Sequence, residues 1–147
     1  MRSLVRSIVV VVGVLAFAGV RTANAQIIDN VDFTTSFAFT AGNTTMPAGS
    51  YTIRPDDDNP QVLFLQGKNA TALFQVDPAT APQTPPRTEV VFSRYGNSYV
   101  LKSIWIEGSD TGAETMPAEG ERHAATAGTK TEQRVAARRK STAGSGR

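Results

Sequence analysis

The sequence predicts an all-β protein: a small antiparallel sandwich or barrel of about six strands, with a disordered or weakly helical C-terminal tail. Two observations predict this. All ten aromatic residues after residue 25 lie between Phe33 and Trp105, in β-favouring segments separated by Gly, Pro, Asn and Asp. Residues 107–147 contain no aromatic residue and are rich in Ala, Gly, Thr and charged residues. Such a segment buries too little apolar surface to offset its ordering entropy.

The start of the chain has the three-part layout of a secretory signal. Arg2 and Arg6 supply positive charge, Ile8 to Val20 is a run of 13 residues without a polar side chain, and Ala23-Asn24-Ala25 supplies small residues for a signal peptidase. A membrane-spanning helix needs about 20 apolar residues. We therefore expect cleavage before Gln26 and a periplasmic or extracellular protein, with an uncleaved anchor as the alternative.

These boundaries divide the chain into three parts. Residues 1–25 are the signal peptide, residues 29–110 form a β-sandwich-like domain, and residues 111–147 are a low-complexity tail with a basic end. Thr129 and Glu132 fit a capping box and predict a marginal helix in that tail.

Alternating or β-branched segments predict the strands of the domain. The expected strands are 33–40, 50–54, 62–65, 71–76, 88–94 and 98–106. Gly42-Asn43 and Pro47-Ala48-Gly49 predict turns, 55–60 a polar loop, and Pro78 to Pro86 an extended crossing on the surface.

The last two strands form the clearest hairpin, with Gly96-Asn97 as its two-residue turn. This turn predicts that Tyr95 faces Ser98, that Phe92 faces Leu101 and that Val90 faces Ser103. The expected core face of the hairpin carries Val90, Phe92, Tyr99, Leu101 and Trp105.

Several short motifs resemble those of a group of small secreted bacterial proteins of uncharacterised function. The motifs are Phe37-Ala38-Phe39, the segment Met46-Pro47-Ala48-Gly49-Ser50-Tyr51, and the hairpin motif Arg94-Tyr95-Gly96 that ends in Ile104-Trp105. The resemblance spans residues 33–118 in pieces and implies an exported β domain. It implies no activity, and the long basic end of this chain departs from the pattern.

The composition argues against the commonest catalytic and metal-binding constellations. The chain has no cysteine, and its one histidine, His123, lies in the predicted tail beside Glu121 and Arg122. General bases and metal ligands need fixed geometry and a partner, so we expect His123 to be an exposed bystander. We expect no cofactor and no enzymatic activity.

Acidic residues supply two weaker candidates. Asp56, Asp57 and Asp58 form the densest acidic run and could hold calcium, but they also suit a polar turn, and the run lacks the spacing of the helix-loop-helix calcium motif. Asp77, Glu89 and Glu107 are carboxylates that could serve a small hydrolase, although no spacing singles out a pair.

Basic residues supply two candidate binding surfaces. Arg94, Tyr95 and Lys102 share the late hairpin and could present a polar, aromatic surface. Residues 26–116 carry five basic and ten acidic residues, whereas residues 117–147 carry seven basic and three acidic residues. Arg134, Arg138, Arg139 and Lys140 could thus contact anionic envelope components by non-specific attraction, with no specific nucleic acid and no stable membrane span after cleavage.

The sequence as a whole predicts an exported, non-enzymatic β domain that acts by binding or as an envelope accessory protein. A small carboxylate-dependent hydrolase and an interaction protein tethered by its basic tail are the alternatives.

Overall fold

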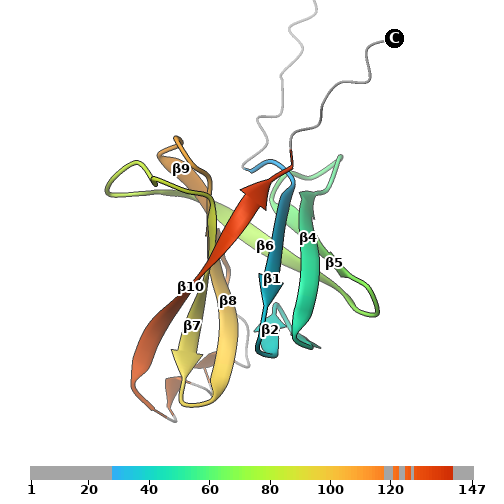
Figure 1. Cartoon of the computed structure of the whole chain (residues 1–147), viewed down its shortest axis with the longest axis vertical. Coiled ribbons are helices and arrows are strands. Elements are labelled where there is room, and N and C mark those ends of the chain that lie inside the picture. The colour runs from blue at the N-terminus through green and yellow to red at the C-terminus, as the bar shows by residue number, and fades with distance from the viewer. Residues whose placement is uncertain (1–27, 118–120, 123–124, 127, 141–147) are drawn as a thin grey trace, which may run out of the picture.

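The structure, a computed structural model, describes residues 28–117, 121–122, 125–126 and 128–140. These residues form ten strands, where the sequence predicted about six. The strands are β1 Val31–Thr35, β2 Phe39–Ala41, β3 Thr44–Met46, β4 Gly49–Pro55, β5 Val62–Gly67, β6 Thr71–Thr80, β7 Glu89–Tyr95, β8 Ser98–Trp105, β9 Thr111–Thr115 and β10 Lys130–Arg139. Figure 1 shows their arrangement.

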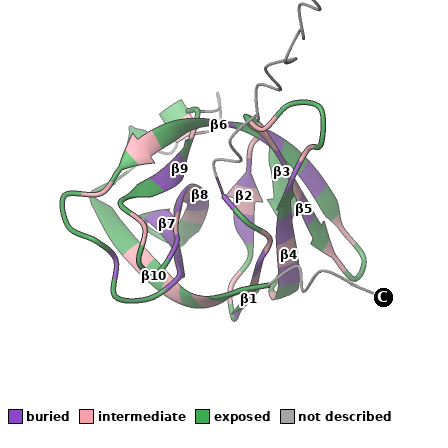
Figure 2. Ribbon diagram, turned by 90° about the horizontal axis from the view of Figure 1, so that it is seen from above, coloured by how far each residue is buried: buried purple, intermediate pink, exposed green. Residues whose placement is uncertain are grey.

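Eight of the described strands close into an antiparallel barrel. Neighbouring strands pair in the order β8-β7-β10-β1-β4-β5-β6-β9, and β9 pairs back to β8. The long strand β6 belongs to both halves of the ring, because residues 71–75 pair with β5 and residues 76–80 with β9. Figure 2 looks into this ring. The predicted all-β, antiparallel fold is confirmed.

The β2–β3 hairpin lies within the ring instead of extending its wall (Figure 2). β2 pairs antiparallel with β3 and makes one parallel pair with β8, between Thr40 and Val100. Phe39 and Met46, which face each other in this hairpin, are almost fully buried. Gly42 has a φ of 59° in the turn and passes so close to β6 that a Cβ there would lie 3.1 Å from the Cβ of Phe74.

Aromatic rings fill the centre of the barrel. The ring of Phe92 lies 5.0 Å from that of Phe39 and 6.1 Å from that of Phe33. Tyr51 stacks on Phe33 at 5.7 Å, and Phe37 stacks on Tyr99 at 3.9 Å. These contacts join β1, β2, β4, β7 and β8, so the aromatic residues that signalled the domain in the sequence form its packing centre.

The expected strand 33–40 is interrupted. β1 ends at Thr35 and β2 begins at Phe39. The Thr35 hydroxyl donates a 2.9 Å hydrogen bond to the carbonyl oxygen of Phe37, which replaces strand pairing with a local turn. The break turns the chain inward and lets Phe37 stack on Tyr99 of β8.

The late hairpin has its two-residue turn at Gly96-Asn97 and the expected pairs Tyr95–Ser98 and Phe92–Leu101. The expected pair Val90–Ser103 is wrong, because Val90 pairs with Ile104. The register passes from Val91–Ser103 to Phe92–Leu101, which leaves Lys102 as one extra residue in β8.

This β-bulge reverses the alternation of β8. Ile104 therefore joins the hydrophobic core, whereas Trp105, which the sequence placed on the core face, is half-buried and faces the outside of the barrel.

The predicted disordered or weakly helical tail is wrong in two segments. β9 pairs with β6 and β8, and β10 pairs with β7 along Lys130–Ala136 and with β1 along Ala137–Arg139. Figure 1 shows β10 running from the side of β7 to the side of β1. The sheet therefore continues beyond residue 110, and the expected helix after Thr129 is a strand. The strand is more stable than a helix here because the open edges of β7 and β1 offer it a full ladder of backbone hydrogen bonds.

Two predictions fall on residues outside the described part of the chain: the signal peptide at 1–25 and the exposed His123. Within the part that the structure describes, no helix is long and apolar enough to cross a membrane.

Candidate ligand-binding groove

A groove of about 500 Å³ lies on the outer face of the barrel, against the proline-rich segment 81–86. Its floor comes from four neighbouring strands, β10, β7, β8 and β9. Val91, Ser103 and Glu114 line it, while the residues beside them in sequence, Val90, Ile104 and Ala113, belong to the hydrophobic core. The alternation of each strand therefore turns one set of side chains into the groove and the other into the barrel.

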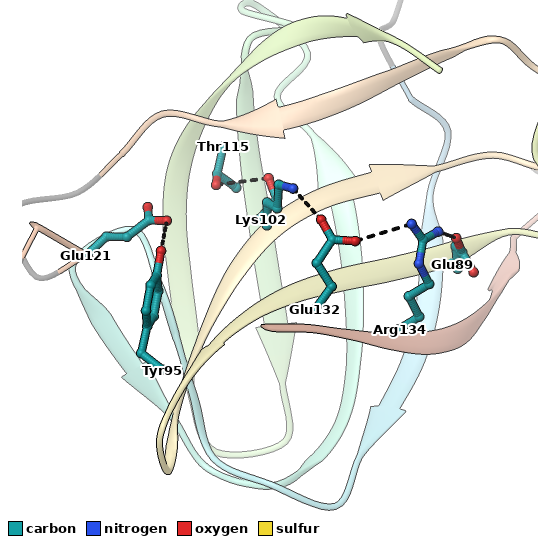
Figure 3. Close-up of polar contacts among 7 residues, drawn as sticks. All are labelled: Glu89, Tyr95, Lys102, Thr115, Glu121, Glu132 and Arg134. Atoms are coloured by element: carbon teal, nitrogen blue, oxygen red, sulfur yellow. Dashed lines mark hydrogen bonds and ion pairs between the residues drawn. The ribbon is translucent and has the colours of Figure 1, made fainter. Parts of the chain in front are cut away.

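A ladder of ion pairs crosses the groove (Figure 3). The Lys102 ammonium lies 2.6 Å from one carboxylate oxygen of Glu132, and the other oxygen lies 3.3 Å from the Arg134 guanidinium. Arg134 also donates to Glu89, whose second oxygen lies 3.3 Å from Nε of Arg87. Cations and carboxylates thus alternate across β8, β10 and β7.

The bulge positions the lysine of this ladder. Lys102 is the extra residue of β8, and the hydroxyl of Thr115 donates to the carbonyl oxygens of Leu101 and Lys102 at 2.8 Å and 3.0 Å. This contact satisfies carbonyl groups at the irregular point of the ladder. The Lys102 side chain then crosses β7 to reach Glu132 on β10.

The charges in the ladder stabilise one another. The hydrogen bond from Lys102 lowers the pKa of Glu132, against a smaller opposing effect of burial. The hydrogen bond to Glu89 raises the pKa of Arg134. The Glu89 side chain is only 8% exposed and forms ion pairs with both Arg87 and Arg134, so its buried charge is compensated. Both pKa shifts favour the ionised forms of Glu132 and Arg134 at neutral pH.

Trp105 forms the aromatic part of the groove. It faces Glu89 on β7, and its indole lies against Gly112 of β9. A Cβ at Gly112 would lie 2.4 Å from Cε3 of Trp105 and 2.5 Å from the carbonyl oxygen of Ile104. Glycine is therefore required at this position for the indole to lie across β9.

The groove is nearly balanced in charge. Glu89, Glu114 and Glu132 supply three carboxylates, and Lys102 and Arg134 supply two cations. The proline-rich segment is fixed at both ends by backbone hydrogen bonds, from Ala81 to Asp110 at 2.7 Å and from Gly108 to Pro85 at 3.1 Å. Strands therefore form one side of the groove, and a proline-rich segment tethered at both ends forms the other.

The candidate surface of Arg94, Tyr95 and Lys102 is not one surface. Lys102 belongs to the ion-pair ladder. Tyr95 is 7% exposed and donates to Glu121 at 3.2 Å, and burial raises the pKa of its hydroxyl. Arg94 points to the other face of β7, where it donates to the carbonyl oxygen of Gly96 at 2.8 Å and lies 5.4 Å from the ring of Tyr99.

The acidic run behaves as a turn. One carboxylate oxygen of Asp56 accepts hydrogen bonds from the backbone N–H groups of Asp58 and Asn59, at 3.0 Å and 2.9 Å. The side-chain oxygen of Asn59 accepts a similar hydrogen bond from the backbone N–H of Gln61 at 3.1 Å. Within the described residues, no group of three or more potential metal ligands of the His, Cys, Asp or Glu type is brought together.

The basic residues of the expected tail are distributed along β10. Arg134 points into the groove, and Arg139 lies 3.3 Å from Asp29. Arg138 lies opposite Asp32 of β1 and lines a second, polar depression of about 620 Å³ over β10, β1, β4 and β5. Lys140 follows the strand and is exposed. Two of the four basic side chains are therefore engaged in ion pairs within the domain.

Sequence reasoning missed most of the groove. It singled out Lys102, Glu89 and Arg134 but assigned them to three different sites. It placed Trp105 in the core and Glu132 at the start of a helix, and it did not consider Glu114 as a site residue. The available signal was the alternation of Glu132, Arg134 and Arg138 with Gln133, Val135 and Ala137, which fits a strand better than a helix.

No family model matches this chain, and no curated protein or solved structure shows a significant similarity to it.

Proposed function

We propose that the protein is an exported, non-enzymatic binding domain that takes a small polar ligand of the cell envelope into the groove over β7 to β10. The observation that carries this proposal is a groove of ligand size that combines one indole with five charged side chains on rigid strands. The secretory layout of residues 1–25 supports the location.

The lining indicates the chemistry of the ligand. Carboxylates accept hydrogen bonds, and lysine and arginine donate them, so the groove offers both kinds of group within one site. A ligand with a strong charge of either sign would meet like charges. A neutral or zwitterionic saccharide suits the lining, because its hydroxyl groups donate and accept while its C–H face packs against Trp105.

The ion pairs favour binding over catalysis. Glycoside hydrolysis needs one carboxyl group with a raised pKa to act as the acid. The pKa of Glu132 is lowered by Lys102, and Glu89 and Glu132 share one guanidinium. Carboxylates held in this way are suited to accept hydrogen bonds from a ligand.

A carboxylate-dependent hydrolase is the second candidate, for one specific reason. Glu89, Glu114 and Glu132 all line the same concave surface, so the groove holds more than one carboxylate. Binding of a saccharide could then be followed by cleavage, which a binding domain would not perform.

Intrinsic fluorescence tests the proposal directly, because Trp105 is the only tryptophan of the chain and lies in the groove. Titration of the purified protein with neutral and zwitterionic fragments of envelope glycans is expected to shift its emission. Glu114→Gln, an exposed groove position, should weaken that binding several-fold, whereas Thr52→Ala, in the polar depression over β4, should leave it unchanged.

Two results would overturn the proposal. One is that no fragment changes the emission of Trp105, or that Glu114→Gln weakens binding no more than Thr52→Ala does. The other is release of new reducing ends from the bound glycan that Glu132→Gln abolishes, which would instead establish the hydrolase.

A further inference from the structure

We infer that β10 is an exchangeable strand, and that the slot between β7 and β1 accepts β10 from a second copy of this chain. Such exchange does not depend on the groove's ligand. Three features support it: how β10 is held, what the slot recognises and how β10 is connected.

β10 is held in the barrel with little help from the core. None of its ten residues is buried, whereas six of the seven residues of β7 are. Its inward side chains are Gln133, Val135 and Ala137, all half-buried. Backbone pairing, ion pairs and the packing of the small side chains of Val135 and Ala137 against the core therefore hold β10. An identical strand can make all of these interactions as well.

The slot recognises the strand by its pattern of charges. Lys102 of β8 contacts Glu132, Glu89 of β7 contacts Arg134, and Asp29 before β1 contacts Arg139. These three partners lie along the slot and fix the register of the incoming strand. A second copy carries the same three residues at the same spacing, so each ion pair that breaks when β10 leaves the slot forms again when the second copy's strand enters it.

The connection to β10 has the length that exchange requires. β9 ends at Thr115 and β10 begins at Lys130, so residues 116–129 connect them. Fully extended, this connection spans about 46 Å, enough to reach an adjacent molecule. Withdrawal of β10 leaves open edges on β7 and β1, which are strong templates for a new strand.

The absence of cysteine from the chain allows a clean cross-linking test. Arg94 and Thr131 are opposed on β7 and β10 and both are exposed, within the range that a disulfide bridges. The double variant R94C/T131C should form this link within one molecule and so confirms the geometry. A mixture of the single variants R94C and T131C, carrying different tags, can form it only between molecules.

Exchange predicts that the mixed single variants, incubated natively at high concentration, form the 94–131 link several-fold more than a matched mixture of T44C and T131C. Peptide mass spectrometry would identify the linked pair. The inference is wrong if the double variant forms its internal link but the mixed single variants give no more intermolecular link than the T44C and T131C mixture. The strand would then not exchange. Failure of the double variant to form its link would also contradict it, because β10 would then not occupy the slot.

Discussion

Glu132 is the residue that connects the two cations of the groove. It accepts from Lys102 at 2.6 Å and lies 3.3 Å from Arg134, and it stands on a strand with no buried side chain. Its carboxylate therefore helps to hold β10 against β7 and β8 as well as lining the groove. The side chain is 40% exposed, so solvent screens these ion pairs and their effect on stability is modest.

The lowered pKa of Glu132 predicts a particular dependence of stability on pH. A group whose pKa is lower in the folded state stabilises that state above its unfolded pKa, near 4.5, and loses the effect as pH falls through the folded value. Glu132→Gln should therefore lower the free energy of unfolding at pH 7 by up to about 1 kcal/mol. The difference from the wild-type protein should shrink as pH falls below the unfolded value.

Denaturant unfolding from pH 7 to pH 3 measures this effect. Glu107→Gln is the matched control, because Glu107 is exposed and lies outside the ion-pair ladder. An E132Q curve parallel to the wild-type curve over the whole range would show that Lys102 and Arg134 do not stabilise the folded carboxylate.

At the level of single elements, the strands with aromatic or β-branched residues were predictable. The segments 50–54, 62–65, 71–76, 88–94 and 98–106 each contain or overlap a strand of the barrel, because each carries its own apolar pattern. β9 carries no such pattern, and the alternation in β10 contains only one larger apolar side chain, Val135. Their conformation depends on partner edges that are distant in sequence, and Thr129 with Glu132 gives a local helix signal that the partner edges override.

One inserted residue explains why the groove was harder to predict than the fold. Without the bulge at Lys102, regular alternation from Leu101 would turn Trp105 toward the core instead of into the groove. Alternation alone cannot reveal a bulge, because the bulge depends on pairing with the neighbouring strand. The site therefore follows from tertiary structure, which brings together residues from four strands and from segment 81–86.

Truncation tests the contribution of β10 as an element. A chain that stops after Gly128 lacks β10 and leaves the edges of β7 and β1 open, so we expect loss of the cooperative unfolding transition and concentration-dependent aggregation. A chain that stops after Lys140 keeps the strand and should unfold like the full chain. Circular dichroism with thermal unfolding compares the two. Equal unfolding transitions would contradict a closing role for β10.

At the scale of the whole molecule, closure joins the two ends of the described chain. β1 and β10 are the first and last described strands and lie side by side, and Lys140 donates its backbone N–H to Asn30 at 2.8 Å. Closure also builds the groove, since β10 brings Glu132 and Arg134 to residues of β7 and β8. The fold and the candidate site thus depend on the same strand.

The register of β10 on β7 can be measured by nuclear magnetic resonance. The backbone N–H of Ala137 donates to the carbonyl oxygen of Thr88, so these two residues form a hydrogen-bonded pair. Hydrogen-bonded and non-hydrogen-bonded pairs alternate along an antiparallel ladder. In this register Ser93 and Glu132 are therefore directly opposed without a backbone hydrogen bond between them. Their Hα atoms should give a strong nuclear Overhauser effect in the purified protein. We predict that cross-peak, together with slow amide exchange at the β10 positions paired to β7; sharp, fast-exchanging resonances for residues 130–139 and no such cross-peak would contradict the closed barrel.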